Sequence, residues 1–289
     1  MTLEKRRNLI GWIFLLPATL LIVFFSFYPM FKAIIRSLYT GIEPRINFAG
    51  IYNYKHMFED TVFIQSVVNT FLYLIIQVPI MLFLALIFAS LLNKKSMRGR
   101  GVYRTMIFLP CAMGLVSYAL IFRSLFATEG MVNQVLMNLG LLKDKVNWLA
   151  VTANARAVII VALIWRWTGY NAVFYIAGLQ NIDHSIYEAA RIDGASSWTQ
   201  LRKITIPLLK PIILLTTIMS TSGTLQLFDE SISLTKGGPA NTTITMSHYI
   251  YKTAFEYNPN FGYASAMSCF ILVLVAILSL IQLKVGDKR

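Results

Sequence analysis

Six stretches of this sequence are long and apolar enough to cross a lipid bilayer as helices. They cover residues 9–31, 62–92, 105–127, 153–178, 206–230 and 261–283. A helix needs about 20 apolar residues to span the hydrocarbon core of a bilayer. Because no water is present there to bond with the backbone, each spanning segment must satisfy its own backbone polar groups as a helix. The sequence therefore predicts an all-α, polytopic membrane protein with six transmembrane helices.

The composition supports a membrane protein and gives no reason to expect nucleic acid. Of the 289 residues, 56% are hydrophobic and 13% are charged, and the mean hydropathy is +0.61. Soluble domains carry about 25% charged residues, so this chain is too apolar to be one. Its net charge of +13 comes from basic residues that cluster between the apolar stretches, where they act as topological signals. We therefore expect membrane lipid, and no nucleic acid, around the chain.

The sequence has no pattern typical of a metal site, a redox site or an ATPase. His56, His184 and His248 are far apart, and Cys111 and Cys269 fall inside apolar stretches without pair spacing. We interpret both cysteines as packing residues. The sequence also lacks the Gly-x-x-x-x-Gly-Lys-Ser/Thr loop that binds phosphates. We expect a protein that is not an enzyme and that binds no cofactor itself.

The basic residues predict that both termini face the cytoplasm. An even number of spans places the two ends on one side of the membrane, and cytoplasmic loops carry an excess of Lys and Arg. The compact basic loop at residues 94–104 decides this orientation. The residues on the predicted inner side are Lys5, Arg6, Arg7, Lys94, Lys95, Arg98, Arg100, Arg104, Arg191, Arg202, Lys203, Lys210, Lys284, Lys288 and Arg289. The first apolar stretch lacks a small-residue cleavage site, so we expect an uncleaved span.

A polar segment at residues 179–205, between the fourth and fifth apolar stretches, predicts a hairpin of two short helices. Its signals are a capping-box pair, a glycine suited to a left-handed helix end, a second capping pair and a proline that redirects the chain. In order, these are Ser185 with Glu188, Gly194, Ser197 with Gln200, and Pro207. On the predicted inner side of the membrane, such a hairpin is suited to dock onto another protein.

The first predicted hairpin helix has side chains suited to docking. The small residues Ala189 and Ala190 let the wall of a partner approach closely, and Arg191 and Asp193 add polar contacts. The alternative is a surface loop that caps itself and touches no partner.

Polar residues inside the fourth and fifth apolar stretches predict a substrate pathway, because polar groups within spans tend to face a cavity or a protein interior. The candidates are Arg166, Trp167, Asn171, Tyr175, Gln226, Asp229 and Glu230. At helical spacing the last three share one face. Arg166 needs a partner, and Asp229 and Glu230 are both candidates. The alternative is that these groups only join helices through hydrogen bonds. We interpret Gln77 with Pro79 as a kink rather than a site.

Two motifs resemble one known family. The first runs through Glu188, Ala189, Ala190, Gly194, Ile204, Ile206, Pro207 and Leu208, and the second is Leu-Thr-Lys-Gly-Gly-Pro-Ala-Asn-Thr-Thr at residues 234–243. Both are similar to signatures of the inner-membrane permease subunits of binding-protein-dependent ABC importers, the second to the carbohydrate branch. Ile206 departs from the usual leucine before proline, and His184 stands where relatives often have proline.

This resemblance implies a type I importer permease fold, with residues 1–289 as one permease domain in a bacterial cytoplasmic membrane. The hairpin at 179–205 would couple it to ATPases through Glu188, Ala189, Ala190, Asp193 and Gly194. The implied partners are a second homologous permease, two ATPase subunits that bind ATP, and an extracytoplasmic sugar-binding protein. The implied mechanism switches an inward-facing cavity outward when ATP closes the ATPases.

We therefore expect a permease that imports a carbohydrate, an oligosaccharide, because aromatic rings and hydrogen-bonding groups together match a sugar. Two alternatives stay open. A permease for another solute, such as a polyol phosphate, would use Arg166 to bind an anion. A membrane-embedded scaffold or sensor would need neither an ATPase nor a cavity.

Overall fold

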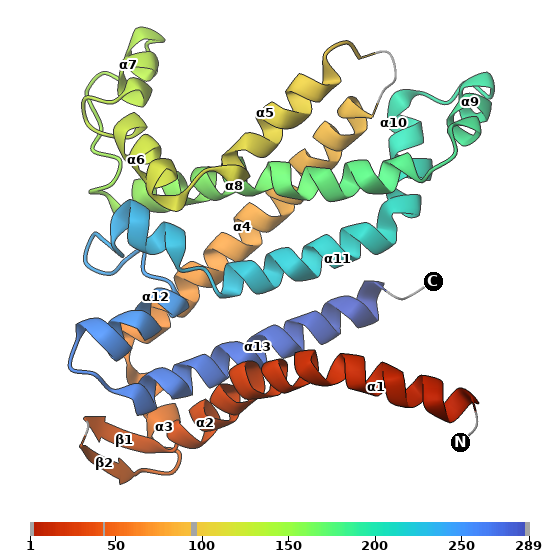
Figure 1. Cartoon of the computed structure of the whole chain (residues 1–289). Coiled ribbons are helices and arrows are strands. Elements are labelled where there is room, and N and C mark those ends of the chain that lie inside the picture. The colour runs from red at the N-terminus through yellow and green to blue at the C-terminus, as the bar shows by residue number, and fades with distance from the viewer. Residues whose placement is uncertain (1–2, 43, 94–96, 287–289) are drawn as a thin grey trace. The chain divides into compact units, whose positions relative to one another are not determined.

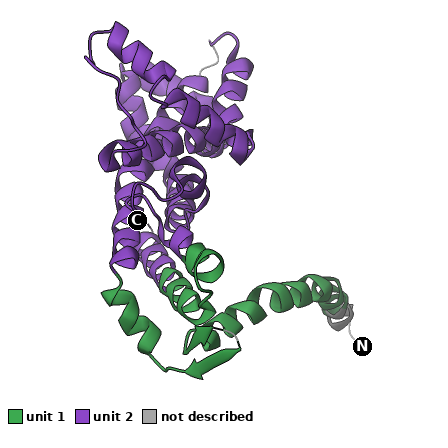
Figure 2. Ribbon diagram, turned by 90° about the vertical axis from the view of Figure 1, so that its left-hand side faces the viewer, with its two compact units in different colours: residues 1–60, 250–272 green, residues 61–249, 273–289 purple. Residues whose placement is uncertain are grey.

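The computed structural model describes residues 3–42, 44–93 and 97–286, and the chain divides into two compact units (Figures 1 and 2). Unit 1 comprises residues 1–60 and 250–272, and unit 2 comprises residues 61–249 and 273–289. Almost all regular structure is helical, as predicted. A two-stranded β-hairpin in unit 1 was not anticipated from the sequence.

Unit 1 joins a long apolar helix to a small polar cap. Its elements are α1 (Leu3–Ile22), the π-helical turn η1 (Val23–Phe27), α2 (Tyr28–Arg36), β1 (Tyr39–Ile42), β2 (Arg45–Phe48), α3 (Tyr52–Glu59), η4 (Lys252–Glu256) and the first part of α13 (Phe261–Gly286). In the β-hairpin Tyr39 pairs with Phe48. The Asn53 side chain joins α3 to β1 by donating to the carbonyl oxygens of Ser37 and Tyr39, each at 2.8 Å. A Cβ on Gly262 would lie 1.8 Å from the Tyr39 carbonyl oxygen, so the close approach of α13 requires glycine.

Unit 2 is a helical bundle. Its elements are α4 (Thr61–Leu92), α5 (Arg100–Ala112), α6 (Leu115–Leu125), α7 (Met131–Asn138), α8 (Thr152–Gln180), α9 (His184–Ile192), α10 (Ser197–Gln200), η2 (Leu201–Thr205), α11 (Ile206–Leu225), η3 (Ser231–Thr235), most of α12 (Met246–Tyr251) and the end of α13. Helix α8 packs on α4, α5 and α11, and α11 also packs on α4 (Figure 1).

Glycine makes the closest of these contacts possible. A Cβ on Gly169 of α8 would lie 1.8 Å from the carbonyl oxygen of Ile107 on α5. A Cβ on Gly178 would lie 2.7 Å from Leu209 on α11. Small residues of this kind allow helix backbones to approach closely in membrane proteins. At Gly169 the backbones of α8 and α5 approach each other, whereas at Gly178 the side chains of Leu209 and Ile212 on α11 pack against α8.

Five helices of the described chain are long and apolar enough to cross a membrane. They are Ile10–Arg36, Thr61–Leu92, Thr152–Gln180, Ser197–Leu225 and Phe261–Gly286. The prediction of a single helix at residues 105–127 is wrong. The structure has two helices there, α5 and α6, which are bent by 97° relative to each other. Only if this pair is taken as one span does the chain have six. Met113 and Gly114 have extended backbones that break the helix. Apolar composition alone does not distinguish one long helix from two short ones.

The fifth predicted span also differs at its end. Helix α11 stops at Leu225, and residues 226–228 are not helical, so the predicted helical end at 230 is wrong. Of the basic residues assigned to the inner side, Lys94, Lys95, Lys288 and Arg289 lie outside the described residues.

Candidate functional site

The hairpin between α8 and α11 has the two short helices that the sequence predicts, α9 and α10, separated at Gly194. The predicted cap on α9 is wrong, because the N-cap is Asp183 and not Ser185. The Asp183 carboxylate accepts a hydrogen bond of 3.0 Å from the Ser185 backbone N–H. This bond holds the pKa of Asp183 below its usual value. Aspartate and serine are both good N-caps, so sequence spacing did not separate them.

The end of α9 confirms the prediction for Gly194. Its φ is +76°, a left-handed conformation that costs a glycine nothing and strains other residues. The Gly194 N–H donates to the Arg191 carbonyl oxygen at 3.0 Å, and the Ala195 N–H donates to the Ala190 carbonyl oxygen at 2.8 Å. The second bond closes the turn of a Schellman motif.

Helix α10 begins one residue earlier than predicted. Its N-cap is Ser196, whose hydroxyl accepts from the Thr199 N–H at 3.2 Å, so the prediction of Ser197 is wrong. The Gln200 amide instead donates to the Ala195 carbonyl oxygen at 2.9 Å and fastens α10 to the turn. The chain then passes through η2 and changes direction into α11, which carries Pro207 in its first turn (Figure 1).

The outer surface of the hairpin combines small, charged and apolar side chains. Four of the five predicted coupling residues, Glu188, Ala189, Asp193 and Gly194, are exposed, and Ala190 is half-buried. Sequence reasoning missed two large apolar side chains on the same hairpin: Ile192 is 87% exposed and Trp198 is 63% exposed. The available signal was their position in a polar segment outside the apolar stretches.

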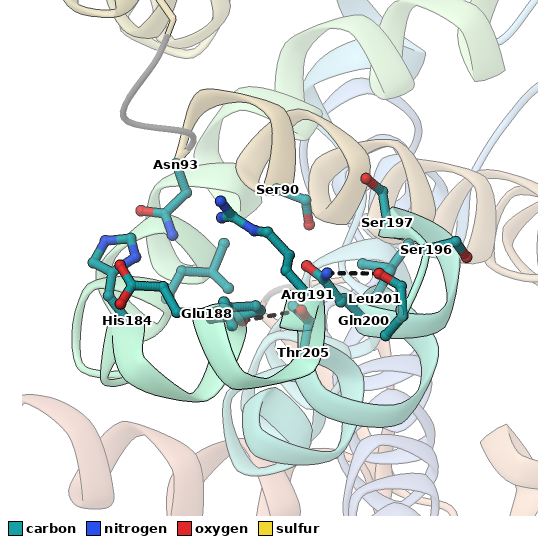
Figure 3. Close-up of a pocket in the computed structure, with 13 residues that line it drawn as sticks. Ser90, Asn93, His184, Glu188, Arg191, Ser196, Ser197, Gln200, Leu201 and Thr205 are labelled. Carbon is teal, nitrogen blue, oxygen red and sulfur yellow. Dashed lines mark hydrogen bonds between the residues drawn. The ribbon is translucent and has the colours of Figure 1, made fainter. Parts of the chain in front are cut away.

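Beneath α9 lies a cavity of about 650 Å³ (Figure 3). Ser90 and Asn93, from the end of α4, line one side of it. His184, Glu188 and Arg191 of α9 line another. Helix α9 is therefore incompletely packed on the rest of unit 2. We call this the hairpin cavity.

A second cavity, of about 470 Å³, lies among α4, α8, α11 and the segment that follows α11. Five of the seven predicted pathway residues line it: Trp167, Asn171, Gln226, Asp229 and Glu230. We call it the polar cavity after these five residues; apolar side chains, among them Met81, Leu163 and Met219, line it as well. Its volume lies within the range of about 300 to 1,000 Å³ that is usual for small-molecule sites.

The backbone conformation that places Gln226, Asp229 and Glu230 at the polar cavity was not predicted from the sequence. We expected Gln226, Asp229 and Glu230 to share one face of a continuous helix. That prediction is wrong, because Gln226 is the C-cap of α11 and the chain is non-helical through Phe228. The break turns the chain so that all three side chains line the same cavity.

Arg166 and Tyr175 are not among the cavity-lining residues. The Tyr175 side chain is 1% exposed, and its hydroxyl lies 2.9 Å from the Thr216 hydroxyl oxygen. Arg166 has the partner that its position predicts: its Nη1 lies 3.8 Å from Oε1 of Glu230. The guanidinium also lies over the ring of Tyr118, at 4.8 Å, and over that of Trp167, at 5.4 Å.

Glu230 holds this cluster together. Its side chain is 3% exposed, and its Oε1 also accepts a hydrogen bond of 3.3 Å from the Trp167 indole N–H. The carboxylate thus lies against the buried guanidinium of Arg166, whose Nε and Nη1 have no hydrogen-bond partner among the described residues, and it bonds to the ring of Trp167. Removing one member of such a buried pair leaves the other charge uncompensated.

Sequence reasoning missed several lining residues. Gln77, interpreted as a kink marker, lines the polar cavity and accepts a hydrogen bond of 3.2 Å from Thr224. Tyr170 and Ser220 line it as well. A polar residue inside the second apolar stretch was a usable signal for Gln77, whereas a lone serine in a span carries little information.

The second motif forms a tightly bonded loop. The hydroxyl of Thr243, which is fully buried, donates to the Gly238 carbonyl oxygen at 2.6 Å and lies 2.8 Å from that of Thr235. Lys236 and Ala240 are exposed at the tip. These bonds explain Thr235 and Thr243 as residues that shape the loop, and the φ of +79° at Gly237 explains a glycine there.

Helices long and apolar enough to span a membrane, with a cavity among them and a capped hairpin between two of them, are the features expected of a membrane permease. The model of the family described as "Binding-protein-dependent transport system inner membrane component" matches residues 61–288. The chain belongs to this family, as its motifs predict, and it is a multi-pass component of the inner membrane.

Relatives and solved structures agree with this assignment. The lactose transport system permease protein LacF of Rhizobium radiobacter is 47% identical over 100% of this chain and 97% of its own length. The trehalose/maltose transport system permease protein MalF of Thermococcus litoralis is 32% identical, over 99% and 97%. A bacterial ABC transporter involved in the import of the acidic polysaccharide alginate contains a chain with a TM-score of 0.85 at 23% identity, covering 99% of this chain and 98% of that one. That likeness supports the predicted permease fold.

Proposed function

We propose that this chain is a sugar-translocating permease and that it carries an uncharged oligosaccharide, of about the size of a disaccharide, into the cytoplasm. The observation that carries this proposal is the polar cavity, where the ring of Trp167 and the amides of Asn171 and Gln226 line one space. Sugars present flat apolar faces rimmed with hydroxyls, which stacking rings and hydrogen-bonding groups match. The names of the lactose and trehalose/maltose relatives support a sugar of this size.

The pairing of Arg166 supports an uncharged substrate over a polyol phosphate. An anion would need a cation that is not already neutralised, whereas Arg166 lies 3.8 Å from the carboxylate of Glu230. The cavity lining adds a second carboxylate, that of Asp229, which repels anions. A scaffold or sensor would have no use for a cavity of this volume, so the transport proposal also explains more than that alternative.

The energy source that we propose is ATP hydrolysed by two separate ATPase subunits that dock on the hairpin. Large exposed apolar side chains in a polar segment are typical of interaction sites, and tryptophans that become buried when a partner binds are frequent energetic centres of interfaces. Trp198 and Ile192 have this character, and Glu188 and Asp193 supply charges beside them. ATP is bound by the partners, and this chain needs no cofactor.

The remaining partners that we propose are a second homologous permease, an extracytoplasmic sugar-binding protein and the surrounding lipid. Residues 1–289 work as one permease domain, with both termini and the hairpin in the cytoplasm. The loop at residues 234–243 then faces outward, toward the sugar-binding protein. The basic residues of the loops motivate this orientation.

In the proposed cycle, ATP binding closes the ATPases and the hairpin moves with them. The polar cavity changes from inward-facing to outward-facing and receives the sugar. The chain forms no covalent bond with its substrate. Its own contribution is to bind the sugar weakly and to change the side on which the cavity opens.

The test is single alanine substitution of Trp167, Asn171 and Gln226 in the complete transporter. Each side chain contributes about 1 kcal/mol through stacking or a hydrogen bond, so uptake should fall several-fold. The affinity of the binding protein for sugar and the assembly of the complex should stay unchanged. Thr217→Ala is the matched control, because the Thr217 hydroxyl donates to the Ile213 carbonyl oxygen of its own helix, and Thr217 does not line the polar cavity. Normal uptake kinetics in all three variants would place the sugar elsewhere.

A further inference from the structure

A side-chain hydrogen bond joins the first hairpin helix to the residue that immediately precedes α11, one of the helices that line the polar cavity. The hydroxyl of Tyr187 on α9 lies 3.0 Å from the hydroxyl of Thr205, the last residue of η2. Thr205 is 4% exposed. Within the described chain, no other side-chain hydrogen bond leaves α9. The hairpin cavity lies beneath α9, so few side chains pack against α9 on that side. The Tyr187–Thr205 bond is therefore a main contact between α9 and the segment that leads into α11.

The receiving end of this bond is a π-helical turn. Residues Leu201–Thr205 form η2, and α11 begins at the next residue. Single π-helical turns are uncommon, and they occur often at functional sites, where they interrupt the regular helix ladder. Thr205 therefore lies at the junction between this turn and the regular helix of α11.

Helix α11 continues the connection through a row of hydroxyls. Thr216, Ser220 and Thr224 are spaced four residues apart and lie on one face of the helix. The Thr216 hydroxyl lies 2.9 Å from that of Tyr175 on α8. Together with Thr205, these three residues form what we call the hydroxyl seam.

The far end of the hydroxyl seam reaches the polar cavity. Ser220 donates to Oδ1 of Asn171 at 3.4 Å, and Thr224 donates to Oε1 of Gln77 at 3.2 Å. Both acceptors line the polar cavity. Thr205 therefore lies directly before α11, and Ser220 and Thr224 near its other end bond to residues that line the polar cavity, so a movement of α11 as one helix would reach that cavity.

We propose that Tyr187 is a positioning residue, whose bond to Thr205 makes α11 move with the hairpin so that the hydroxyl seam changes the exposure of the polar cavity. This inference rests on the proposed function, in which ATPases move the hairpin. Tyrosine suits the task, because its ring is rigid and only its hydroxyl makes the link. The inference also explains why Tyr175, predicted as a pathway residue, is buried against Thr216: it holds α8 and α11 in register.

The experiment measures how an ATP-driven change reaches the polar cavity, and it needs no knowledge of the sugar. Cys111 and Cys269 are replaced by serine, and a single cysteine is introduced by Gln226→Cys, at an exposed position that lines the polar cavity. The rate of labelling by a thiol reagent is measured on the assembled complex, with and without ATP plus vanadate. The ratio of the two labelling rates measures how much the exposure of the polar cavity changes when ATP and vanadate are added.

Tyr187→Phe and Thr205→Val each remove one hydroxyl and keep the shape of the side chain. The equilibrium that sets the labelling ratio should shift by roughly threefold to tenfold, the effect of losing one buried hydrogen bond. The double variant should be no worse than either single one, and Thr205→Ser should restore the normal ratio. The amount of copurified ATPase should stay normal in all of them.

Trp198→Ala is the control for docking, because it should lose copurified ATPase as well as the switch. An unchanged labelling ratio in Tyr187→Phe would overturn the inference while leaving the proposed function intact. A loss in Tyr187→Phe that parallels loss of the ATPase would also overturn it, since Tyr187 would then only support the fold. An unchanged rate in the unsubstituted complex would overturn the proposed function itself.

Discussion

The buried pair of Arg166 and Glu230 gives the sharpest prediction about stability. Glu230→Gln keeps the size of the side chain and an oxygen that can accept from the Trp167 indole N–H, so it removes little besides the charge. The side chains of Glu230 and Arg166 are 3% and 11% exposed, so water cannot compensate the remaining guanidinium. Breaking a buried pair on one side costs about 3 to 5 kcal/mol. For a chain of this size the midpoint of thermal unfolding should fall by roughly 6 to 10 °C.

The assay is the loss of folded complex on heating in detergent, followed by size-exclusion chromatography. Asp229→Asn is the matched control, because Asp229 is the neighbouring residue and is exposed. Replacing both members, as in Arg166→Met with Glu230→Gln, should recover much of the loss, since no lone buried charge remains. A midpoint for Glu230→Gln equal to that of Asp229→Asn would refute the argument that this pair is desolvated.

Three further predictions concern the hairpin, the helix packing and the orientation. Gly194→Val should strain the left-handed turn by about 1 to 2 kcal/mol. The chain should still insert into the membrane, but copurified ATPase and sugar uptake should both fall. Normal values of both would contradict a coupling role for this turn. Gly169→Ala should prevent stable assembly, because its Cβ would lie 1.8 Å from the Ile107 carbonyl oxygen; Gly101→Ala, with open space around it, should assemble normally, and equal yields would contradict the packing. Gln200→Cys should be protected from an impermeant thiol reagent in intact cells and Lys143→Cys should react; the reverse pattern would invert the topology.

The sequence predicted the structure best at positions where only one residue type suits the backbone conformation. The left-handed turn at Gly194 followed from glycine between two capping signals, and the structure has it. The caps themselves were less certain, because Asp183 and Ser196 are as suitable as the neighbouring serines that we had chosen. In the same way, apolar content predicted that helices fill the membrane, but the break at Met113 and Gly114 depends on local backbone conformation.

The polar cavity shows why a site is harder to predict than a span. Trp167 and Asn171 were recognisable, because polar and amphipathic groups are costly inside an apolar stretch. Tyr175 satisfied the same criterion and is instead buried against Thr216. Gln77 and Ser220 belong to other helices, and only the packing of α4, α8 and α11 brings them into the same space. Residues that are far apart in the sequence cannot be recognised as neighbours until the packing of the helices is known.

The measurement that tests the central claim most directly is sugar uptake into proteoliposomes. The vesicles contain this chain with its second permease and ATPases, with ATP inside and the binding protein outside with a radiolabelled neutral disaccharide, lactose first. We predict accumulation that requires ATP, the binding protein and this chain, and that falls several-fold in Trp167→Ala. Accumulation that is unchanged when this chain is omitted, or uptake restricted to anionic solutes, would contradict the proposal.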